Sequence, residues 1–292
     1  MLIQITNTCT FGCPHCLQNS TPEPQHMPIG VYQNALALSK MAGCQFLMIS
    51  GGEPTDHPDW EHYLDLALCD MKPAVILITN GKWLGTKKED AILKLLKIHP
   101  FFLIQINNDP RYYPDWSASE IPKLYERFMK RMNDELCGSC MDILLTMNGG
   151  LSRVSLIREV NDIKALGRAA TDKTLCEVAR SCNSTTSCAS TALIAAQTHG
   201  DFKCAISTME QHMNWCHPLV DWQGGMHWSE SWLCPPFFTI PDHLLLDEAM
   251  FLQIAEAACA WRPCGKCEDY QKFMAKTDPK YVKAREILGI SK

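Results

Sequence analysis

Residues 2–16 read LIQITNTCTFGCPHC, a short apolar run that leads directly into three cysteines, Cys9, Cys13 and Cys16. The run Leu2–Thr6 alternates β-branched and polar residues and predicts a strand. A glycine and a proline between the cysteines keep the following segment from becoming helical. The stretch therefore predicts a strand followed by a loop in which three thiols converge.

The same unit, a short apolar run followed by a longer amphipathic stretch, recurs through the first half of the chain. The candidate strands are Leu2–Thr6, Gln45–Ser50, Ala74–Thr79, Phe102–Asn107 and Met141–Met147, with a weaker sixth around Ile163–Leu166. Helical patterns lie between them, near 28–43, 59–71, 87–98 and 119–135. Alternating strands and helices indicate an α/β fold with a parallel sheet. Six such units predict a partial (β/α)6 barrel of the TIM type.

Composition and charge exclude several classes of protein. The chain has 292 residues, of which 46% are hydrophobic and 20% charged, as in an ordinary globular protein. Its formal net charge of -5 gives no long-range attraction to phosphate backbones, which argues against nucleic acid as the principal partner. No apolar run approaches the roughly 18 residues of a membrane span, and no signal peptide is recognisable. We therefore expect no membrane partner and a cytoplasmic location.

The chain contains 16 cysteines, and in a reducing cytosol such a number favours metal ligation over disulfides. The thiols Cys9, Cys13 and Cys16 suit either zinc or an iron–sulfur cluster. A structural zinc site needs a fourth protein ligand, which His15 is badly placed to supply beside Cys16. Three ligands would instead leave one iron open to a substrate or cofactor. Zinc binding and plain free thiols are the alternatives.

The spacing C-x3-C-x2-C, with His15 before the last cysteine, resembles the defining motif of the radical S-adenosylmethionine (SAM) superfamily. The resemblance implies that Cys9, Cys13 and Cys16 hold a [4Fe–4S] cluster. It also implies that the iron without a cysteine ligand binds the amino and carboxylate groups of SAM.

Downstream motifs extend this resemblance. Ser50-Gly51-Gly52-Glu53-Pro54 follows the second strand and is similar to the family's GGEP motif, whose backbone and acid contact the SAM amino group. Read alone, the segment would be an ordinary turn. The full set of expected SAM contacts is His15, Gly51, Gly52, Glu53, Pro54, Asn80, Gln105, Asn107 and Arg168.

Two of these contacts depart from the family pattern or have a plain alternative. The family commonly has a serine or similar small residue on strand four, followed two residues later by aspartate, and here Asn107 precedes Asp109. This departure puts the contacts to the SAM ribose in doubt. Gly167-Arg168-Ala169 resembles the family's GRA element, and a solvated arginine is the alternative.

The second half of the chain differs in composition. After about residue 175 it is rich in cysteine, Ser/Thr, tryptophan and proline, so we divide the chain into a barrel domain, 1–175, and a cysteine-rich domain with a C-terminal helix, 176–292. Two short β-like runs around Gln223-Gly224-Gly225 predict a hairpin between Cys216 and Cys234. Cys264-Gly-Lys-Cys267 has the spacing of a metal-binding knuckle.

This layout resembles the SPASM and twitch extensions of radical SAM enzymes. It implies one auxiliary [4Fe–4S] cluster held by Cys216, Cys234, Cys264 and Cys267, and a zinc knuckle of the same residues is the alternative. The remaining candidates are less specific. Cys182, Cys188 and Cys204 could form a second cluster or a redox-active thiol, and Asp221 could transfer protons.

The family resemblance implies an enzyme that cleaves SAM reductively and uses the 5′-deoxyadenosyl radical to remove hydrogen from a substrate. We expect the substrate to be a peptide or protein, with a small-molecule metabolite as the alternative. An external electron donor of the flavodoxin or ferredoxin type is implied, and a separate protein could recognise the substrate. The hypothesis from another class is a zinc-stabilised binding module without catalysis.

Overall fold

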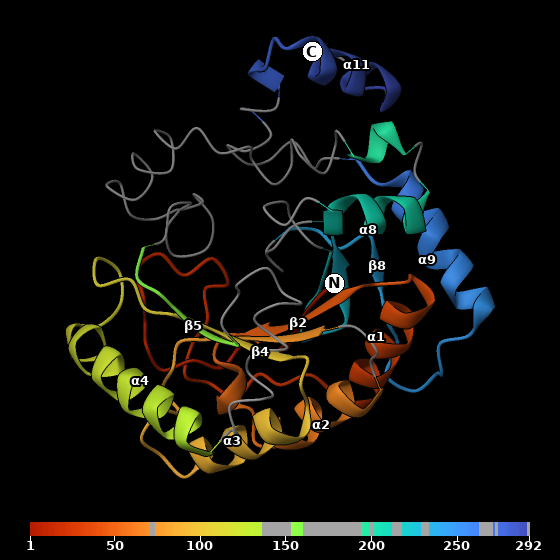
Figure 1. The fold of residues 1–292 in the computed structure, drawn as a ribbon. Helices are drawn as coiled ribbons and strands as arrows, with labels where there is room; N and C mark the ends of the chain where they lie inside the picture. Colours follow the sequence, from red (N-terminus) through yellow and green to blue (C-terminus); the bar gives the residue numbers. More distant parts are fainter. Residues whose placement is uncertain are drawn as a thin grey trace.

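The structure is a computed structural model that describes residues 1–70, 74–135, 153–159, 194–198, 201–211, 218–228, 234–262, 271 and 274–290. One sheet organises these residues, with the strand order β5-β4-β3-β2-β1-β6-β7-β8 (Figure 1). The strands are β1 Leu2–Thr6, β2 Phe46–Gly51, β3 Ala74–Thr79, β4 Phe102–Asn107, β5 Val154–Ile157, β6 Leu219–Val220, β7 Gly225–His227 and β8 Phe238–Thr239. The six strands from β5 to β6 are mutually parallel, and β7 pairs in antiparallel fashion with both β6 and β8. The fold is therefore α/β with a mostly parallel sheet, as predicted.

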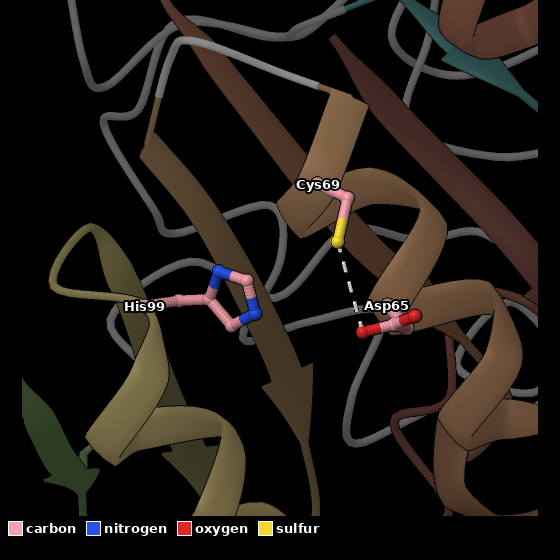
Figure 2. A group of neighbouring side chains, drawn as sticks. All are labelled: Asp65, Cys69 and His99. Atoms are coloured by element: carbon pink, nitrogen blue, oxygen red, sulfur yellow. Dashed lines mark hydrogen bonds between the residues drawn. The ribbon is translucent and has the colours of Figure 1, made fainter.

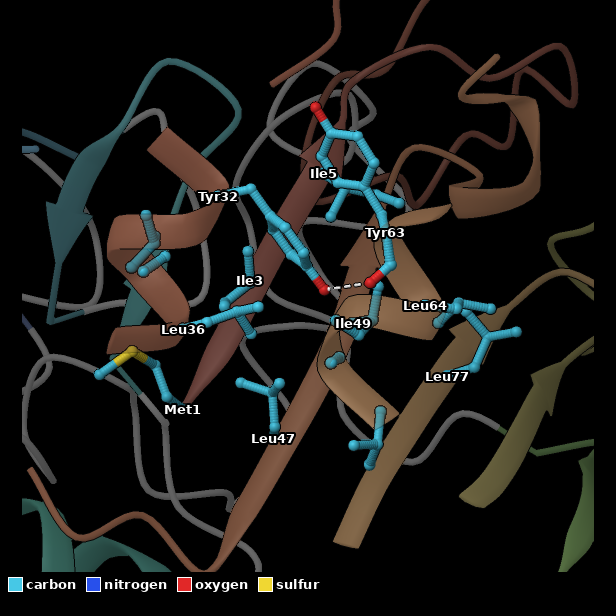
Figure 3. Packing of buried hydrophobic residues seen from close by; sticks show 14 of the residues in the cluster. Met1, Ile3, Ile5, Tyr32, Leu36, Leu47, Ile49, Tyr63, Leu64 and Leu77 are labelled. Carbon is cyan, nitrogen blue, oxygen red and sulfur yellow. Dashed lines mark hydrogen bonds between the residues drawn. The ribbon is translucent and has the colours of Figure 1, made fainter. Parts of the chain in front are cut away.

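The helices of the first half follow the strands in βα order and lie along one side of the sheet (Figure 1). They are α1 Ile29–Met41, α2 Trp60–Asp70, α3 Lys88–Ile98 and α4 Asp115–Glu135, and a short 3-10 helix, η1 Pro54–Asp56, precedes α2. Figure 3 shows how alternate strand residues such as Ile3, Leu47 and Leu77 pack against the helical side chains of Tyr32 and Leu64. Period-two alternation places these strand residues on a single face.

The opposite face of the sheet is less covered. On β2, β3 and β4 the residues that alternate with the core positions are half-buried, among them Met48, Ile76 and Leu103. A parallel sheet that is buried on one side and partly open on the other is the arrangement expected of an incomplete barrel. We call this half-buried face the open face of the sheet.

The described part of the C-terminal half joins this same sheet. β6 pairs with β1 in parallel, and β6 and β7 form the hairpin that the sequence predicted. Its helices are α8 Phe202–Gln211, α9 Glu248–Ala260 and α11 Pro279–Ile287. Phe202 of α8 and Phe251 of α9 belong to the same hydrophobic cluster as the core residues of the first half, so these helices share the main core. The proposed boundary near residue 175 lies outside the described residues.

Most first-half elements agree with the sequence predictions. The predicted strands at Leu2–Thr6, Ala74–Thr79 and Phe102–Asn107 are confirmed with the same bounds, and β2 is displaced by one residue. The predicted strands Met141–Met147 and Ile163–Leu166 lie outside the described residues. The strand that pairs with β4 is Val154–Ile157, a four-residue run that the sequence analysis did not identify. No helix among the described residues is both long and apolar enough to cross a membrane.

Helix α4 begins four residues before the predicted start and contains Pro122 in its interior. Proline lacks the N–H that would bond to the carbonyl of Ala118, one turn earlier. The guanidinium of Arg158, which follows β5, donates to this carbonyl at 3.0 Å and to Asn108 Oδ1 at 3.1 Å. Arg158 therefore replaces the missing helical bond and attaches α4 to β5.

We predict that Arg158→Met costs about 2 kcal/mol of unfolding free energy, because two acceptors lose a charged donor. In a Pro122→Ala background the cost should be roughly 1 kcal/mol smaller, since residue 122 then supplies an N–H to Ala118. Urea unfolding of the unmodified protein, the two single variants and the double variant measures the cost of Arg158→Met in each background. An equal cost of Arg158→Met in both backgrounds would contradict the claim that Arg158 replaces the hydrogen bond that Pro122 cannot donate.

Candidate active site

The segments that follow β1 and β2 are joined by backbone hydrogen bonds at the carboxyl ends of the strands. Gly52 N donates to Thr6 O at 2.8 Å, and Glu53 N donates to Thr8 O at 2.9 Å. In barrels of this type the chemistry takes place at this edge of the sheet. The loop that contains the three cysteines therefore starts from a position fixed by the GGEP segment.

Gly51 and Gly52 allow this close approach. A Cβ atom at Gly51 would lie 2.3 Å from Thr6 O, and one at Gly52 would lie 2.4 Å from Thr8 O. Both contacts are with backbone atoms, so a side chain at either position would displace the start of the cysteine loop. The structure thus gives the two glycines a packing role, independent of any bound ligand.

Glu53 is the central hydrogen-bond acceptor of the site. Its side chain is fully buried and accepts from the Thr79 hydroxyl at 2.8 and 2.9 Å, from Asn80 N at 2.8 Å, and from the N–H and hydroxyl of Thr55. Burial raises the pKa of Glu53, and these donors act in the opposite direction. A carboxylate offers about four lone-pair sites, and protein donors bind both oxygens of Glu53 in this arrangement.

The three cysteines occupy the loop after β1. Cys9 is buried, whereas Cys13 and Cys16 are half-buried. The Asn80 amide donates to Cys9 Sγ at 3.7 Å, and Ser20 N donates to Cys16 Sγ at 3.4 Å. Burial raises the pKa of Cys9 to about 11, so this thiol becomes a thiolate near neutral pH only when a positive centre binds it.

The spacing of the thiols bears on which metal group they fit. Three thiolates around one tetrahedral zinc ion would lie about 3.8 Å apart, from a Zn–S bond of about 2.3 Å. Among the described residues, Cys9, Cys13 and Cys16 do not form a group whose ligand atoms all lie within 4.8 Å of one another. An iron–sulfur cluster, in which each thiolate binds a different iron, does not require three sulfur atoms to lie so close together.

Hydrogen bonds fix the rest of the loop. The Asn7 side chain accepts from Gln4 at 3.2 Å and from the Ser20 hydroxyl at 2.9 Å, and it donates to Gln25 at 2.8 Å. Cys9 N donates to Thr21 O at 2.7 Å. Both arms of the loop are therefore bound to each other at its base.

A lysine attaches the tip of the loop to the neighbouring strand ends. Lys82 Nζ donates to the Thr10 hydroxyl at 2.9 Å and to Asp56 at 3.1 Å. Thr10 immediately follows Cys9, while Asp56 and Lys82 follow β2 and β3 respectively. The ion pair is partly exposed, so its contribution to stability is small and its main effect is orientation.

Aromatic residues of the segment after β4 cover the cysteine loop. The His15 ring lies 5.1 Å from the Tyr112 ring and 5.2 Å from the Tyr113 ring, measured between centroids. Phe11 contacts Tyr113 and Trp116 in edge-on geometry. These ring contacts attach the segment after β4 to the cysteine loop, and sequence reasoning did not identify the tyrosines as part of the site.

The predicted ligand contacts on β4 lie on the open face of the sheet. Gln105 and Asn107 are half-buried, and the Gln105 amide donates to Asn107 Oδ1 at 2.9 Å. Ser155 lies beside Gln105 on the neighbouring strand. Asp109 is fully buried and accepts from the backbone N, Nε and Nη2 of Arg111, the shortest distance being 2.6 Å, so its carboxylate serves to hold the loop after β4.

The remaining predicted residues are only partly described. Pro54 is buried and begins η1. Cys234 is half-buried and Cys204 is exposed on α8. The predicted residues outside the described part of the chain are Arg168, Cys182, Cys188, Cys216, Cys264 and Cys267.

The possible proton-transfer residue Asp221 has a structural partner. Its Oδ2 lies 2.7 Å from His227 Nε2, and both side chains are buried. Oδ1 of Asp221 accepts from Gln223 N and Gly225 N, each at 2.8 Å. These bonds close the turn of the β6–β7 hairpin, which accounts for an aspartate at this position.

Comparison with known proteins gives one family match. The model of the Radical SAM superfamily matches residues 3–150, about half of the chain. No curated protein matches the sequence significantly. Among solved structures, Streptococcus suis SuiB bound to S-adenosylmethionine is similar over 96% of this chain and 75% of its own, with 15% identity and a TM-score of 0.42.

We predict that Thr79→Val costs about 2 kcal/mol of unfolding free energy, because buried Glu53 then loses the hydroxyl that bonds both of its oxygens. Valine has nearly the shape of threonine, so the change removes little packing. Thr79→Ser retains the hydroxyl and is the matched control. Unfolding midpoints in urea measure the difference, and an equal loss in both variants would show that packing, not hydrogen bonding, makes Thr79 important.

Proposed function

The chain belongs to the radical SAM superfamily, and from this we propose that it cleaves SAM reductively and removes a hydrogen atom from a substrate. The observation that supports this proposal best is the bonding of the cysteine loop to two other motifs. The GGEP backbone fixes the start of the loop, and Asn80 donates to Cys9 Sγ. Residues distant in sequence thus converge where the family resemblance predicts a cofactor site.

We assign Cys9, Cys13 and Cys16 to a [4Fe–4S] cluster. When bound, such a cluster and SAM supply the electron transfer and carbon–sulfur cleavage that produce a 5′-deoxyadenosyl radical. The protein holds the thiols in place through Asn7, Asn80 and Ser20. Tyr112, Tyr113 and Phe11 pack around the loop, and we assign them the role of keeping water from reactive species, which limits side reactions.

The proposed SAM contacts have different roles. Gly51 and Gly52 offer backbone groups at the strand edge, while Gln105 and Asn107 present amides on the open face of the sheet. The other proposed contacts are His15, Pro54, Asn80 and Arg168. Glu53 remains a proposed contact of the SAM amino group, and its carboxylate also binds Thr79, Asn80 and Thr55, which fixes its position.

The proposal extends to one auxiliary [4Fe–4S] cluster held by Cys216, Cys234, Cys264 and Cys267. The support is the order of these cysteines around the β6–β7 hairpin, together with the half-buried position of Cys234 just before β8. By the same resemblance we propose a peptide or protein substrate. An external flavodoxin- or ferredoxin-type donor would supply electrons, and a separate protein could present the substrate.

We predict that anaerobically reconstituted protein contains about eight irons, four for each proposed cluster, and forms 5′-deoxyadenosine from SAM with dithionite. Cys13→Ala should lose about four irons and reduce this activity at least about a hundredfold, because the cluster loses one of three ligands. Iron analysis and chromatography of the products measure both.

Cys259→Ala is the control, since Cys259 is an exposed cysteine on α9 outside both proposed ligand sets. It should retain the iron content and activity of the unmodified protein. An iron content of about four per unmodified protein would contradict the proposed auxiliary cluster. A colourless zinc protein without SAM cleavage would instead support the binding module.

The substrate class makes a separate prediction. Extract of the source organism, divided by size, should stimulate 5′-deoxyadenosine formation above the substrate-free rate mainly in the peptide fraction. Protease treatment of that fraction should abolish the stimulation. Stimulation by the small-molecule fraction, unchanged by protease, would replace the peptide with a metabolite and leave SAM cleavage unaffected.

A further inference from the structure

A second group of potential metal ligands lies far from the cysteine loop. Asp65, Cys69 and His99 place a carboxylate oxygen, a thiol sulfur and an imidazole nitrogen within 4.8 Å of one another. Figure 2 shows the three side chains converging from α2 and from the turn after α3. Among the described residues, no other set of three such ligands meets this distance. We propose that Asp65, Cys69 and His99 bind a zinc-type divalent cation.

The two ligands on α2 have a favourable spacing. Asp65 and Cys69 are four residues apart, which places them on the same face of the helix. Cys69 Sγ lies 3.8 Å from Asp65 Oδ1. Oxygen and sulfur ligands of one tetrahedral zinc lie about 3.6 Å apart, from bond lengths of about 2.1 and 2.3 Å. The observed pair therefore needs almost no movement to bind a single ion.

The third ligand is held by a well-anchored turn. His99 is the C-terminal cap of α3, and its backbone N–H donates to Leu95 O at 2.9 Å. Its carbonyl accepts from Arg153 at 2.7 Å and from Phe102 N at 3.2 Å. Because the backbone is fixed on both sides, the imidazole reaches α2 from a defined position.

The electrostatic environment also favours a cation. Asp65 and Cys69 lie in the last two turns of α2, and His99 directly follows α3. Helix C-termini have partial negative charge from unpaired carbonyls, and two of them meet here. With Asp65 and a deprotonated Cys69, the ligands balance the double positive charge of the ion.

The ligand set selects the class of metal. One thiolate, one imidazole and one carboxylate match the N, S and O preferences of zinc, whereas magnesium and calcium prefer oxygen alone. Asp65 and Cys69 are exposed and His99 is half-buried, so the ion has an entry path and room for water as a fourth ligand.

The proposed cation site is separate from the proposed catalytic site. α2 ends just before β3 begins, and His99 lies just before β4. The group therefore lies at the amino ends of the strands, opposite the cysteine loop at their carboxyl ends. In barrels, this edge serves stability, whereas the carboxyl edge serves catalysis. The ion would join α2 to the α3–β4 turn.

Zinc titration of the reconstituted holoprotein tests this inference, with the cluster cysteines already bound to iron. Competition against a chromophoric zinc chelator measures affinity, and metal analysis measures stoichiometry. We expect Cys69→Ser to bind one zinc fewer than the unmodified protein, or to bind it roughly a hundredfold more weakly. Zinc should also raise the thermal midpoint of the unmodified protein but not that of the variant.

His99→Gln is a second variant in case Cys69→Ser folds poorly, and it should show the same loss. Cys259→Ser, which changes an exposed cysteine outside the group, should bind zinc normally. Unchanged zinc affinity and stoichiometry in both Cys69→Ser and His99→Gln would overturn the proposal. SAM cleavage should be the same in all these proteins, so the result is independent of the proposed catalytic function.

Discussion

The burial of one carboxylate organises the site. Glu53 has no solvent exposure and depends on donors from η1, from the last residue of β3 and from the residue after it. A buried carboxylate without such donors would be costly, so Thr79 and Asn80 must lie where they can bond to it. Asn80 in turn donates to Cys9. The ends of β2 and β3 and the cysteine loop are thus positioned through one side chain.

This arrangement explains why a sheet built largely from apolar residues has a polar carboxyl edge. One face of the strands packs against α1 to α4, and the other is half-buried. Polar side chains such as Gln105 and Asn107 lie on the open face, and buried Thr79 lies at the carboxyl end of β3. The core therefore provides rigidity, and the edge provides the groups that can contact a cofactor, which is the usual division in barrel folds.

Much of the first half could be predicted from the sequence, because periodicity reports directly on burial. Strands such as Ala74–Thr79 consist of apolar, β-branched residues bounded by turns, and they form as expected. Val154–Ile157 was missed because four residues give too short a pattern. Helix α4 begins at Asp115, four residues before the predicted start, and Arg158 compensates for Pro122 in its interior.

Site residues that belong to short motifs could be predicted from the sequence. Site residues that come together only through contacts between distant segments could not. Cys9 and Gly52 lie in recognisable patterns, but the contribution of Thr79 depends on a carboxylate 26 residues away in sequence. Tyr113 covers the loop from the segment after β4, and no local pattern indicates this. The position of the hairpin beside β1 likewise depends on a pairing between the two halves of the chain.

The most direct test of a cofactor site at the cysteine loop is electron paramagnetic resonance of the reconstituted, reduced protein, with and without SAM. The account predicts the signal of a reduced [4Fe–4S] cluster whose shape changes when SAM is added, because one iron has no cysteine ligand. A cluster signal that SAM leaves unchanged, or no cluster signal at all, would contradict it.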